Sequence, residues 1–366
     1  MVTPRRAVLP DAKERQQPVT DKRKIIQIGL GGWGWSWVNI VKTSAEWELA
    51  AVVDIDADRL KAAAGQFGLS GEQLHGSLDS AIRATKADAC LVVVPPEAHA
   101  PVTIAATRAG LHCLVEKPIA DTVAAAKSMV AGARDHGVTL MVNQNYRYRR
   151  AAVTLRKLMT EGTIGDAGTI YINFQKAAHF GGSFREKMAH PLVLDMAIHH
   201  FDQLRGLVGF EPVEVQAQSW NPPWSWFAGD PVANAVFTSQ NGATAVYTGS
   251  WVSQGWQTTW DGDWRIQARE GEIHWKDNQI RLLPTSVFTS VFVPGARERD
   301  GWLDVDLIPM DVEDRLATLR EFARAIAEKR EPQTSGADNL RTLATVLATC
   351  LSIERREPVT LAEVLS

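Results

Sequence analysis

Apolar runs of strand length alternate with helix-length segments between residues 24 and 145. The runs rich in Val, Ile and Leu predict strands at residues 24–29, 48–54, 89–94, 112–116 and 139–144. The segments between them bear Ala and Lys or Arg, and they predict helices at residues 33–43, 57–66, 77–85, 97–109 and 122–136. Because strands that alternate with helices build a parallel sheet covered on both faces, we expect a doubly wound α/β domain.

The pattern changes after residue 145. The expected elements there are a helix at 149–161, a strand at 168–177, an apolar helix at 191–208, β-rich sequence from 213 to about 293, and helices at 311–329 and 336–355. This order predicts a second α+β domain whose sheet is mixed and mostly antiparallel. We therefore divide the chain into a flexible tail (1–22), an α/β domain (23–145) and an α+β domain (146–366), with the closing helices 311–355 as candidates for packing back on the first domain.

Length and charge narrow the class of protein. A chain of 366 residues exceeds what one hydrophobic core usually serves, and 45% hydrophobic with 22% charged residues is an ordinary globular composition. Lys and Arg number 39 against 42 Asp and Glu, so the net charge is −3. Such a balance leaves no basic footprint for nucleic acid or an anionic membrane, and no stretch reaches the length of a membrane span. Neither nucleic acid nor membrane is an expected partner.

The cysteines and the N-terminal tail bear on the compartment. Cys90, Cys113 and Cys350 are odd in number and far apart, so they suggest neither a disulfide framework nor a zinc site. The pair Arg5-Arg6 resembles the start of a twin-arginine signal, but charged residues occupy the place of the apolar region that such a signal requires. We therefore expect a protein of the reducing cytoplasm.

The first candidate site is a glycine-rich turn. Residues 29–34 read Gly29-Leu30-Gly31-Gly32-Trp33-Gly34, directly after a strand and at the start of a helix. The next strand ends at Asp54, 20 residues beyond Gly34, where an acid is expected to meet the adenosine ribose of a dinucleotide. This pattern predicts a cofactor whose diphosphate binds at the helix N-terminus. Asp54 would repel a 2′-phosphate, which favours NAD over NADP, although Arg59 lies one turn further on.

Two further motifs follow strands. Residues 93–99 read Val-Val-Pro-Pro-Glu-Ala-His, with Pro95 and His99 as candidate cofactor neighbours, and Glu116-Lys117-Pro118 follows the next strand. The carboxyl ends of strands in an open α/β sheet face the ligand crevice, so both motifs are expected to border the cofactor. Lys117 is either a solvated loop lysine or a group that holds an alkoxide during hydride transfer.

The helix at 191–208 carries the other candidate groups. At about 100° per residue, Asp195 and His199 fall on one stripe with Asp202. His200 points toward the apolar side, where packing or a hydrogen bond is its expected role. The pair Asp195 and His199 is either a simple i,i+4 pair on a polar face or an acid and an imidazole aimed at a substrate. We expect no metal, because no third ligand accompanies them.

Together these motifs resemble the Gfo/Idh/MocA oxidoreductase family, which includes glucose-fructose oxidoreductases and inositol dehydrogenases. The resemblance spans residues 24 to 355, and its specific parts are Glu116-Lys117-Pro118 and Asp195-x-x-x-His199. It implies an N-terminal Rossmann domain and a C-terminal domain whose large open sheet supports homodimers or homotetramers. It also implies hydride transfer between a sugar or polyol hydroxyl and NAD(P) without a metal.

The resemblance assigns roles to individual residues. Lys117 corresponds to the family's active-site lysine, with Asp195 and His199 as its substrate-holding and proton-transferring partners. Asn145 and Arg147 resemble residues at the nicotinamide and the substrate. Besides these, Trp33 is a candidate at the cofactor and His179 at the substrate. The residues that precede Asp195 depart from the family's glycine run, so the loop over the substrate is expected to differ.

Three functions remain open at this stage. The first is an NAD-dependent sugar or polyol dehydrogenase. The second is an enzyme that keeps NAD bound and uses transient oxidation for glycoside cleavage or epimerisation, and the third is a non-catalytic NAD sensor or corepressor.

Seven Trp residues lie within residues 220–264. They are expected to fill a core or a subunit interface more than to stack on a sugar ring.

Overall fold

The computed structural model describes residues 6–7, 22–285 and 301–366. The chain divides into two compact units, each of which is taken by itself below. The first unit holds the described part of Glu14–Tyr148 together with Asp311–Leu343. The second holds the described parts of Met1–Lys13 and Arg149–Met310 together with Ala344–Ser366. The first unit thus gathers the segment up to residue 148 with one that returns to it from near the C-terminus.

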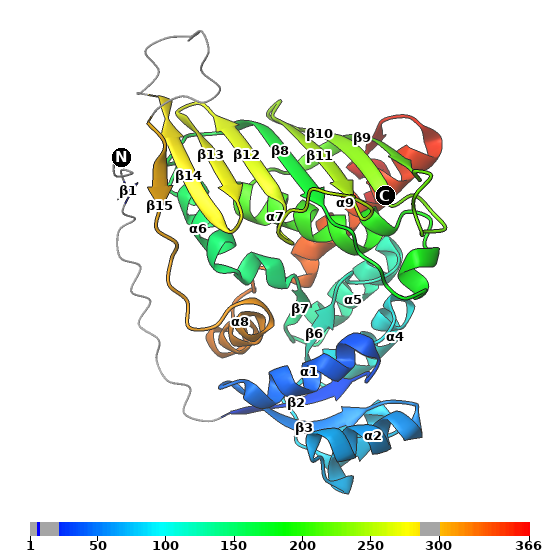
Figure 1. The fold of residues 1–366 in the computed structure, drawn as a ribbon. Coiled ribbons are helices and arrows are strands. Elements are labelled where there is room, and N and C mark those ends of the chain that lie inside the picture. The colour runs from blue at the N-terminus through cyan, green and yellow to red at the C-terminus, as the bar shows by residue number, and fades with distance from the viewer. Residues whose placement is uncertain (1–5, 8–21, 286–300) are drawn as a thin grey trace. The chain divides into compact units, whose positions relative to one another are not determined.

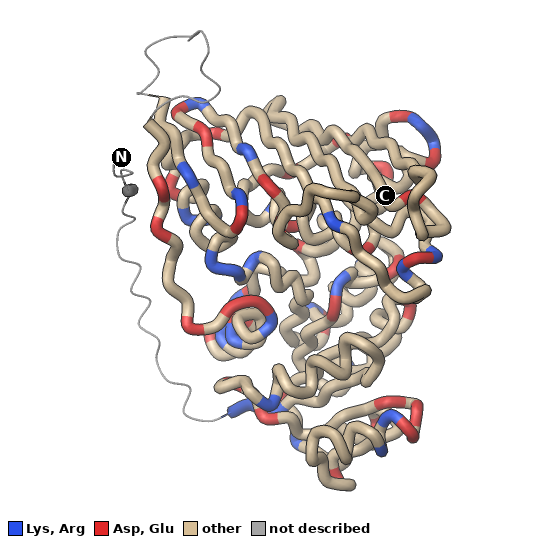
Figure 2. Tube along the Cα trace, viewed as in Figure 1, with Lys and Arg blue, Asp and Glu red and all other residues tan. Residues whose placement is uncertain are grey.

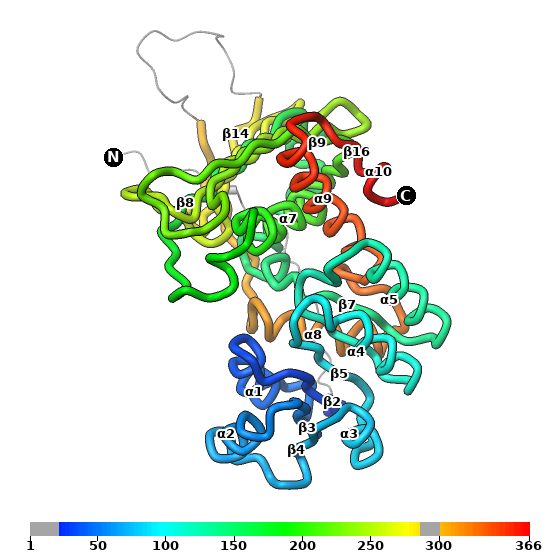
Figure 3. Tube along the Cα trace, turned by 90° about the vertical axis from the view of Figure 1, so that its right-hand side faces the viewer, coloured from blue at the N-terminus to red at the C-terminus, as the bar shows by residue number. Residues whose placement is uncertain are grey.

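The first unit is built on a six-stranded parallel sheet in the order β4-β3-β2-β5-β6-β7 (Figure 1). Its strands are β2 (Arg23–Ile28), β3 (Trp47–Val53), β4 (Leu74–His75), β5 (Ala89–Val92), β6 (His112–Glu116) and β7 (Leu140–Asn143). Its connecting helices are α1 (Gly32–Thr43), α2 (Ala57–Phe67), α3 (Leu78–Ala84), α4 (Pro96–Arg108) and α5 (Val123–Asp135). Figure 3 shows α1 and α2 on one side of the strands and α4 and α5 on the other. The predicted doubly wound sheet is confirmed.

Local sequence signals explain where these helices start and stop. The Asp56 side chain accepts hydrogen bonds from the amides of Asp58 and Arg59 and so caps the start of α2. Gly110 and Gly137 follow α4 and α5 with φ of +80° and +65°, the left-handed conformation that a glycine adopts without strain. The strand β4 has two residues, and no periodic pattern in the sequence predicted it.

The helix α8 (Asp314–Glu328) packs on the first unit. The Trp47 indole on β3 donates a hydrogen bond of 2.8 Å to the carbonyl of Leu319 and stacks on Phe322 at 5.2 Å between ring centroids. The Arg320 guanidinium lies 2.9 Å from the carboxylate of Glu46. These contacts attach a segment from residue 311 onward to strands formed near the beginning of the chain.

The second unit is built on a ten-stranded sheet in the order β1-β15-β14-β13-β12-β8-β11-β10-β9-β16 (Figure 1). Its strands are β1 (Arg6–Ala7), β8 (Ala167–Gln175), β9 (Pro212–Trp220), β10 (Val232–Ser239), β11 (Thr244–Ser250), β12 (Asp263–Ala268), β13 (Gly271–Lys276), β14 (Gln279–Pro284), β15 (Leu303–Val305) and β16 (Val359–Thr360). Parallel pairing joins β8 to β11 and β1 to β15, and the other pairs are antiparallel. The predicted mixed, mostly antiparallel sheet is confirmed.

Helices cover one face of this sheet. They are α6 (Arg150–Thr160), α7 (Ile198–Val208) and the C-terminal part of α9 (Gly336–Arg355), and α10 (Leu361–Leu365) follows β16. Figure 1 shows α6 and α7 against the sheet. Alternate residues of the strands, such as Ile170 and Ile172, are buried beneath these helices, whereas Tyr171 is 42% exposed on the other face.

The Trp-rich segment divides between core and surface. Trp251, directly after β11, and Trp264 on β12 are buried, as expected of residues that fill a core. Trp220, Trp224, Trp256 and Trp260 are exposed to between 45% and 56%. These four are therefore not core residues of the chain, and the other expected role, a subunit interface, stays a prediction for them.

Two features of the whole chain concern charge and membranes. Basic and acidic residues are interspersed along both units (Figure 2). Within residues 6–7, 22–285 and 301–366, no helix combines the length and the apolar character that crossing a bilayer requires. Within the expected tail, residues 6 and 7 form β1, and residues 1–5 and 8–21 lie outside the described residues.

Candidate functional site

The glycine-rich turn is built from two kinds of glycine. Gly29 has φ of +100°, and a Cβ atom added to it would lie 2.2 Å from the carbonyl oxygen of Val93. A Cβ atom on Gly34 would lie 2.2 Å from the carbonyl oxygen of Gly29. Around Gly31 and Gly32, by contrast, no atom lies within 4 Å of the Cβ position. The first pair is therefore required for the turn itself, and the second leaves open space at the start of α1.

Gln27 holds this turn together. Its side-chain amide donates hydrogen bonds of 3.1 Å to the carbonyl of Gly29 and 2.7 Å to the carbonyl of Gly34, and the residue is fully buried. A buried amide that bridges both ends of the turn fixes its shape. Sequence reasoning missed this residue. The available signal was a single polar position inside an apolar strand.

Asp54 lies beside the turn, at the end of β3. One of its carboxylate oxygens accepts a hydrogen bond of 2.7 Å from the amide of Leu30, and the other accepts one of 2.9 Å from the amide of Asp56. Arg59 lies 4.0 Å from Asp54 and 3.3 Å from Asp56. A carboxylate has about four acceptor sites, so two remain for ribose hydroxyls.

These features fit a dinucleotide. The first amides of an α-helix have no intrahelical carbonyl to bond, and the helix dipole favours an anion there. At α1 this end lies next to the open space at Gly31 and Gly32, which lets a diphosphate approach the backbone. Asp54 stands next to the same turn, as ribose recognition requires.

Glu116 joins three elements at the carboxyl edge of the sheet. One carboxylate oxygen accepts hydrogen bonds of 2.7 Å from the Trp37 indole on α1 and 2.9 Å from the Asn143 side chain on β7. The other accepts one of 3.1 Å from the amide of Lys117. Glu116 therefore fixes the backbone from which the half-buried Lys117 projects. The peptide bond between Lys117 and Pro118 is cis.

His99, expected near the cofactor, is buried between the loops that follow β5 and β6. Its ring is 1% exposed, and its two nitrogens lie 2.9 Å from the carbonyl oxygens of Pro118 and Val94. Burial lowers the pKa of the His99 imidazole, and the two carbonyls oppose that shift. His99 thus joins the loops after β5 and β6. Pro95, by contrast, is exposed at the N-terminus of α4.

Asn145 and Arg147 lie in a short 3₁₀-helix after β7 (Asn145–Tyr148). The Asn145 side chain donates a hydrogen bond to the carboxylate of Asp314. Arg147 is 4% exposed and lies 2.7 Å from the carboxylate of Asp338. The Arg147 guanidinium is thus buried in a pair with the α9 segment, and its contact with the substrate stays a prediction.

In the second unit, Asp195 and His199 lie on either side of a change from π-helix to α-helix. Leu192–Ala197 form a π-helical turn, and the α-helix α7 begins at Ile198. The spacing of 100° per residue therefore does not apply between Asp195 and His199, although the extent of the predicted helix is right. His199 is 6% exposed and Asp202 is 1% exposed, so neither faces bulk solvent. Turns of this type recur at functional sites.

Asp195 is paired with a residue that sequence reasoning missed. The Arg185 Nε donates a hydrogen bond of 2.8 Å to the Asp195 carboxylate. The Arg185 guanidinium also lies 4.9 Å from the centroid of the Phe184 ring. The two charged side chains are 19% and 15% exposed, so they are largely shielded from water. This contact orients the Asp195 carboxylate.

The loop that carries Arg185 is organised by Glu186. The Glu186 carboxylate accepts hydrogen bonds of 2.6 Å from the amide of Phe180 and 2.7 Å from the amide of Gly182. It also lies 2.9 Å from Nδ1 of His179, whose ring stacks on Trp226 with an angle of 4° between the planes. His179 is 65% exposed and is thus accessible to a ligand.

His200 takes the structural role that the sequence predicted. Its Nε2 lies 3.0 Å from the carbonyl oxygen of Trp260 and its Nδ1 lies 3.2 Å from the Tyr247 hydroxyl. These partners suit a neutral ring that donates from Nε2 and accepts at Nδ1. Burial lowers the pKa of the His200 imidazole to about 4.

This shift predicts a pH-dependent stability of the second unit. Between the ordinary pKa of 6.5 and about 4, the unfolded chain binds a proton at His200 that the folded chain excludes. The free energy of unfolding therefore decreases as the pH falls through this window, by about 1.4 kcal/mol for each pH unit. His200→Gln removes this component, so urea unfolding of the variant is expected to show a shallower pH dependence than the wild type. Equal slopes in the two proteins contradict the assignment.

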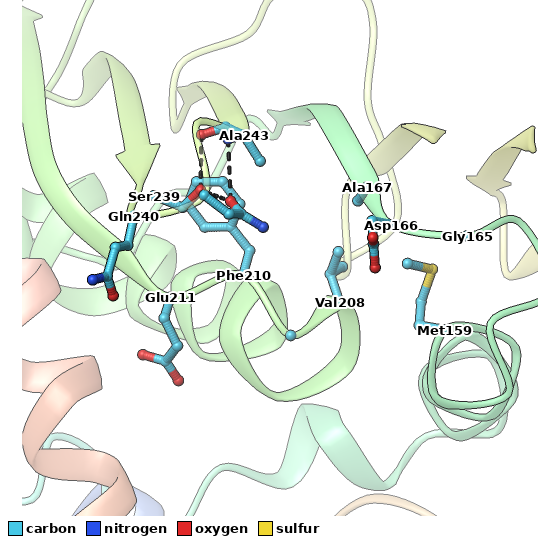
Figure 4. Close-up of a pocket in the computed structure, with 12 residues that line it drawn as sticks. Met159, Gly165, Asp166, Ala167, Val208, Phe210, Glu211, Ser239, Gln240 and Ala243 are labelled. Carbon is cyan, nitrogen blue, oxygen red and sulfur yellow. Dashed lines mark hydrogen bonds between the residues drawn. The ribbon is translucent and has the colours of Figure 1, made fainter. Parts of the chain in front are cut away.

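A cavity of about 240 Å³ lies elsewhere in the second unit, between the ends of α6 and α7 and the turn joining β10 to β11 (Figure 4). Met159, Val208 and Phe210 contribute apolar lining, and Asp166 and Glu211 contribute carboxylates. Glu211 is already paired with Arg205 at 2.9 Å. None of the predicted site residues lines this cavity.

In the described part of the chain, no group of three His, Cys, Asp or Glu side chains is placed to hold a metal.

Comparison with known proteins places the two units in one family. Residues 23–144 match the model of an oxidoreductase family with an NAD-binding Rossmann fold, and residues 152–274 match the GFO/IDH/MocA C-terminal domain. The chain belongs to the GFO/IDH/MocA oxidoreductase family. The resemblance inferred from the sequence is thereby confirmed.

Relatives in this family include sugar and polyol dehydrogenases. The chain is 29% identical over 327 residues to a D-apiose dehydrogenase of Paraburkholderia graminis, an alignment that covers 86% of this chain and 83% of that protein. It is 30% identical over 201 residues to an inositol 2-dehydrogenase of Rhizobium meliloti, covering 52% and 56%. An oxidoreductase from Agrobacterium radiobacter, crystallised with NAD⁺, L-tartaric acid and magnesium, shares the fold at a TM-score of 0.82 and 21% identity, over 94% of this chain and 100% of that one.

Within this GFO/IDH/MocA protein, the predicted site residues fall into two groups. The first unit gathers Asp54 and the glycine turn with Glu116 and Lys117 at the carboxyl edge of one parallel sheet. The second unit carries Asp195, His199 and His179. The structure adds Gln27, Trp37 and Arg185 as residues that hold the predicted ones in place.

Proposed function

We propose that this protein transfers a hydride between NAD and a hydroxyl-bearing carbon of a sugar, glycoside or polyol. The observation that carries the proposal is that one edge of the six-stranded sheet bears both the dinucleotide turn, with Asp54, and Lys117. Family membership and the D-apiose and inositol 2-dehydrogenase relatives support this substrate class.

The residues of the first unit are proposed to bind the cofactor. Gly31 and Gly32 leave room for the diphosphate, and Asp54 accepts from the ribose hydroxyls. Pro95, Asn145 and the exposed Trp33 are further proposed contacts, whereas Gly29, Gly34, Glu116 and His99 shape the turn and the loops around it. NAD, when bound, supplies the hydride acceptor.

Electrostatics at Asp54 favour NAD over NADP. A 2′-phosphate would approach two carboxylates, Asp54 and Asp56, with Arg59 as their nearest cation, at 4.0 and 3.3 Å. Asp54→Asn keeps an acceptor for the Leu30 amide but removes one of these charges. The variant is expected to bind NADH about tenfold more weakly and to lose most of its discrimination against NADPH.

Fluorescence titration with NADH and NADPH measures this change. Asp58→Asn is the matched control, because Asp58 is an exposed acid on the first turn of α2. Its dissociation constants are expected to equal those of the wild type. Wild-type protein that binds NADPH as tightly as NADH would overturn the preference for NAD.

Lys117, His199 and Asp195 are proposed to perform the chemistry on the substrate hydroxyl. His199 accepts the hydroxyl proton as general base, and the Lys117 ammonium stabilises the alkoxide that develops. Asp195, oriented by Arg185, holds a substrate hydroxyl, and His179 at the surface of the neighbouring loop is a proposed substrate contact.

One experiment separates the three functions that remain open. Purified protein, excess NAD and a panel of inositols, aldoses and glycosides are mixed, and NADH absorbance and sugar products are followed together. Stoichiometric NADH is the result expected of the proposed dehydrogenase. Product without NADH indicates the redox-neutral cycle, and neither signal, with NAD still bound, indicates a sensor.

Assembly and compartment complete the proposal. We propose a homodimer or homotetramer through the open face of the ten-stranded sheet, where Tyr171 and Val236 are each 42% exposed. Replacing both with Asp is expected to lower the mass measured by light scattering.

We propose the cytoplasm as the compartment, because Cys90, Cys113 and Cys350 are buried free thiols.

A further inference from the structure

Arg315, the second residue of α8, lies against α1 of the same unit. Its Nη1 donates a hydrogen bond of 2.7 Å to the Ser36 hydroxyl. Its guanidinium carbon lies 5.3 Å from the centroid of the Trp33 ring and 5.2 Å from that of Trp37. Three side chains of α1 therefore position one cation, through two indole faces and a hydroxyl.

This cation stands near the dinucleotide turn. Trp33 and Ser36 are the second and fifth residues of α1, so at 1.5 Å per residue Ser36 lies about 6 Å along the axis from the first amide. Trp33 is 55% exposed, and the space beside Gly31 and Gly32 is open. The guanidinium is thus within reach of an anion that binds at the start of α1.

The backbone before Arg315 is also held at the sheet edge. Asp314 has φ of +60°, a conformation that few non-glycine residues adopt. Its carboxylate accepts hydrogen bonds from the Asn145 side chain after β7 and, at 2.8 Å, from the amide of Arg315. A fixed contact to the end of β7 thus directs Arg315 toward α1 rather than along α8.

Arg315 differs from other arginines on and after α8 in the partners of its guanidinium. Arg320 is paired with Glu46 at 2.9 Å and Arg330 with Glu321 at 2.7 Å. Across residues 22–285 and 301–366, no carboxylate lies within 4.0 Å of the Arg315 guanidinium. A guanidinium has five donors, and the bond to Ser36 uses one of them. The others suit a phosphate, which binds such a fork through charge-assisted hydrogen bonds.

We propose that Arg315 binds the diphosphate of the dinucleotide and that Trp33, Ser36 and Trp37 hold it ready for that contact. The inference deepens the proposed function at its cofactor site and depends on a dinucleotide binding there. The helix N-terminus supplies amides and a dipole, and Arg315 supplies the full positive charge that the glycine turn itself lacks.

Calorimetric titration of the full chain tests this contact without turnover. The ligands are NAD, ADP-ribose, ADP and AMP, and the variants are Arg315→Gln and Arg315→Lys. Arg315→Gln is expected to raise the dissociation constants of NAD, ADP-ribose and ADP about tenfold or more, that of AMP by less, and to flatten their salt dependence. Arg315→Lys is expected to restore part of the affinity, because it returns the charge without the fork.

Lys42→Gln is the matched control, since Lys42 lies at the other end of α1 and bonds the carbonyl of Phe67. Its ligand affinities are expected to equal those of the wild type. The inference is overturned if Arg315→Gln and Lys42→Gln weaken ADP equally, if neither Arg315 variant changes ADP affinity by more than twofold, or if the wild type binds no ADP-ribose. Weaker ADP binding in a protein that oxidises no sugar supports Arg315 while refuting the dehydrogenase.

Discussion

Lys117→Met is expected to lower kcat by at least about 10³-fold and to leave the dissociation constant of NAD within about threefold of the wild type. Methionine keeps most of the length of the side chain but removes the ammonium that stabilises the alkoxide. The substitution keeps the backbone amide of Lys117, which donates a hydrogen bond to the Glu116 carboxylate. Stopped-flow measurement of NADH formation with the best substrate of the panel, together with calorimetry for NAD, gives both quantities.

Lys86→Met is the matched control for this prediction. Lys86 is exposed in the same unit and lies shortly before the N-terminal end of β5, at the opposite edge of the parallel sheet. The same substitution there is expected to leave kcat unchanged. A Lys117→Met variant with full activity would remove Lys117 from the reaction, and equal losses in both variants would indicate a general effect on folding.

His199→Ala is expected to lower kcat about 10²- to 10⁴-fold, the range typical of a lost general base, with NAD binding retained. The ring is 6% exposed on the first turn of α7, so the smaller side chain also costs stability, which thermal unfolding measures. The pH profile separates the two effects. Loss of the acidic limb of kcat/KM in the variant indicates a base, whereas an unchanged profile with lower activity indicates packing alone.

His136→Ala serves as the control for His199. His136 is exposed at the C-terminal cap of α5 and bonds the carbonyl of Gly132. Its activity and pH profile are expected to match those of the wild type. If His199→Ala retained activity within threefold, Lys117 would become the group to test as the base, because it is the other group proposed to act on the substrate hydroxyl.

The fold was predictable where the pattern is local and long enough. Five strands of the first sheet and its helices follow from runs of apolar residues that alternate with helical segments. The strand β4 has only two residues, so no periodicity marks it. The π-helical turn at Leu192–Ala197 carries no signal that distinguishes it from the α-helix that follows. Pairing of residues 6 and 7 with β15 depends on a contact between chain segments about 300 residues apart, which no local pattern encodes.

The site was predictable to the same extent and for the same reason. The glycine turn with Asp54 has a fixed spacing along the chain, so it could be identified from the sequence. Trp37 with Glu116 and Arg315 with Ser36 are separated by 79 and 279 residues, and their pairing requires the folded structure. His99 and Arg147 were predicted in the site from their position after strands. Their burial and their carbonyl and carboxylate partners depend on distant parts of the chain, so the sequence did not show them.

The bridge that Gln27 makes between the carbonyls of Gly29 and Gly34 limits how this protein can evolve. One amide group of fixed length spans the whole motif, so inserting or deleting a residue there would break at least one of its two bonds. Changes in chain length are therefore confined to positions outside the span. The segment that begins at Asp54 is the place where natural or laboratory selection has room to act.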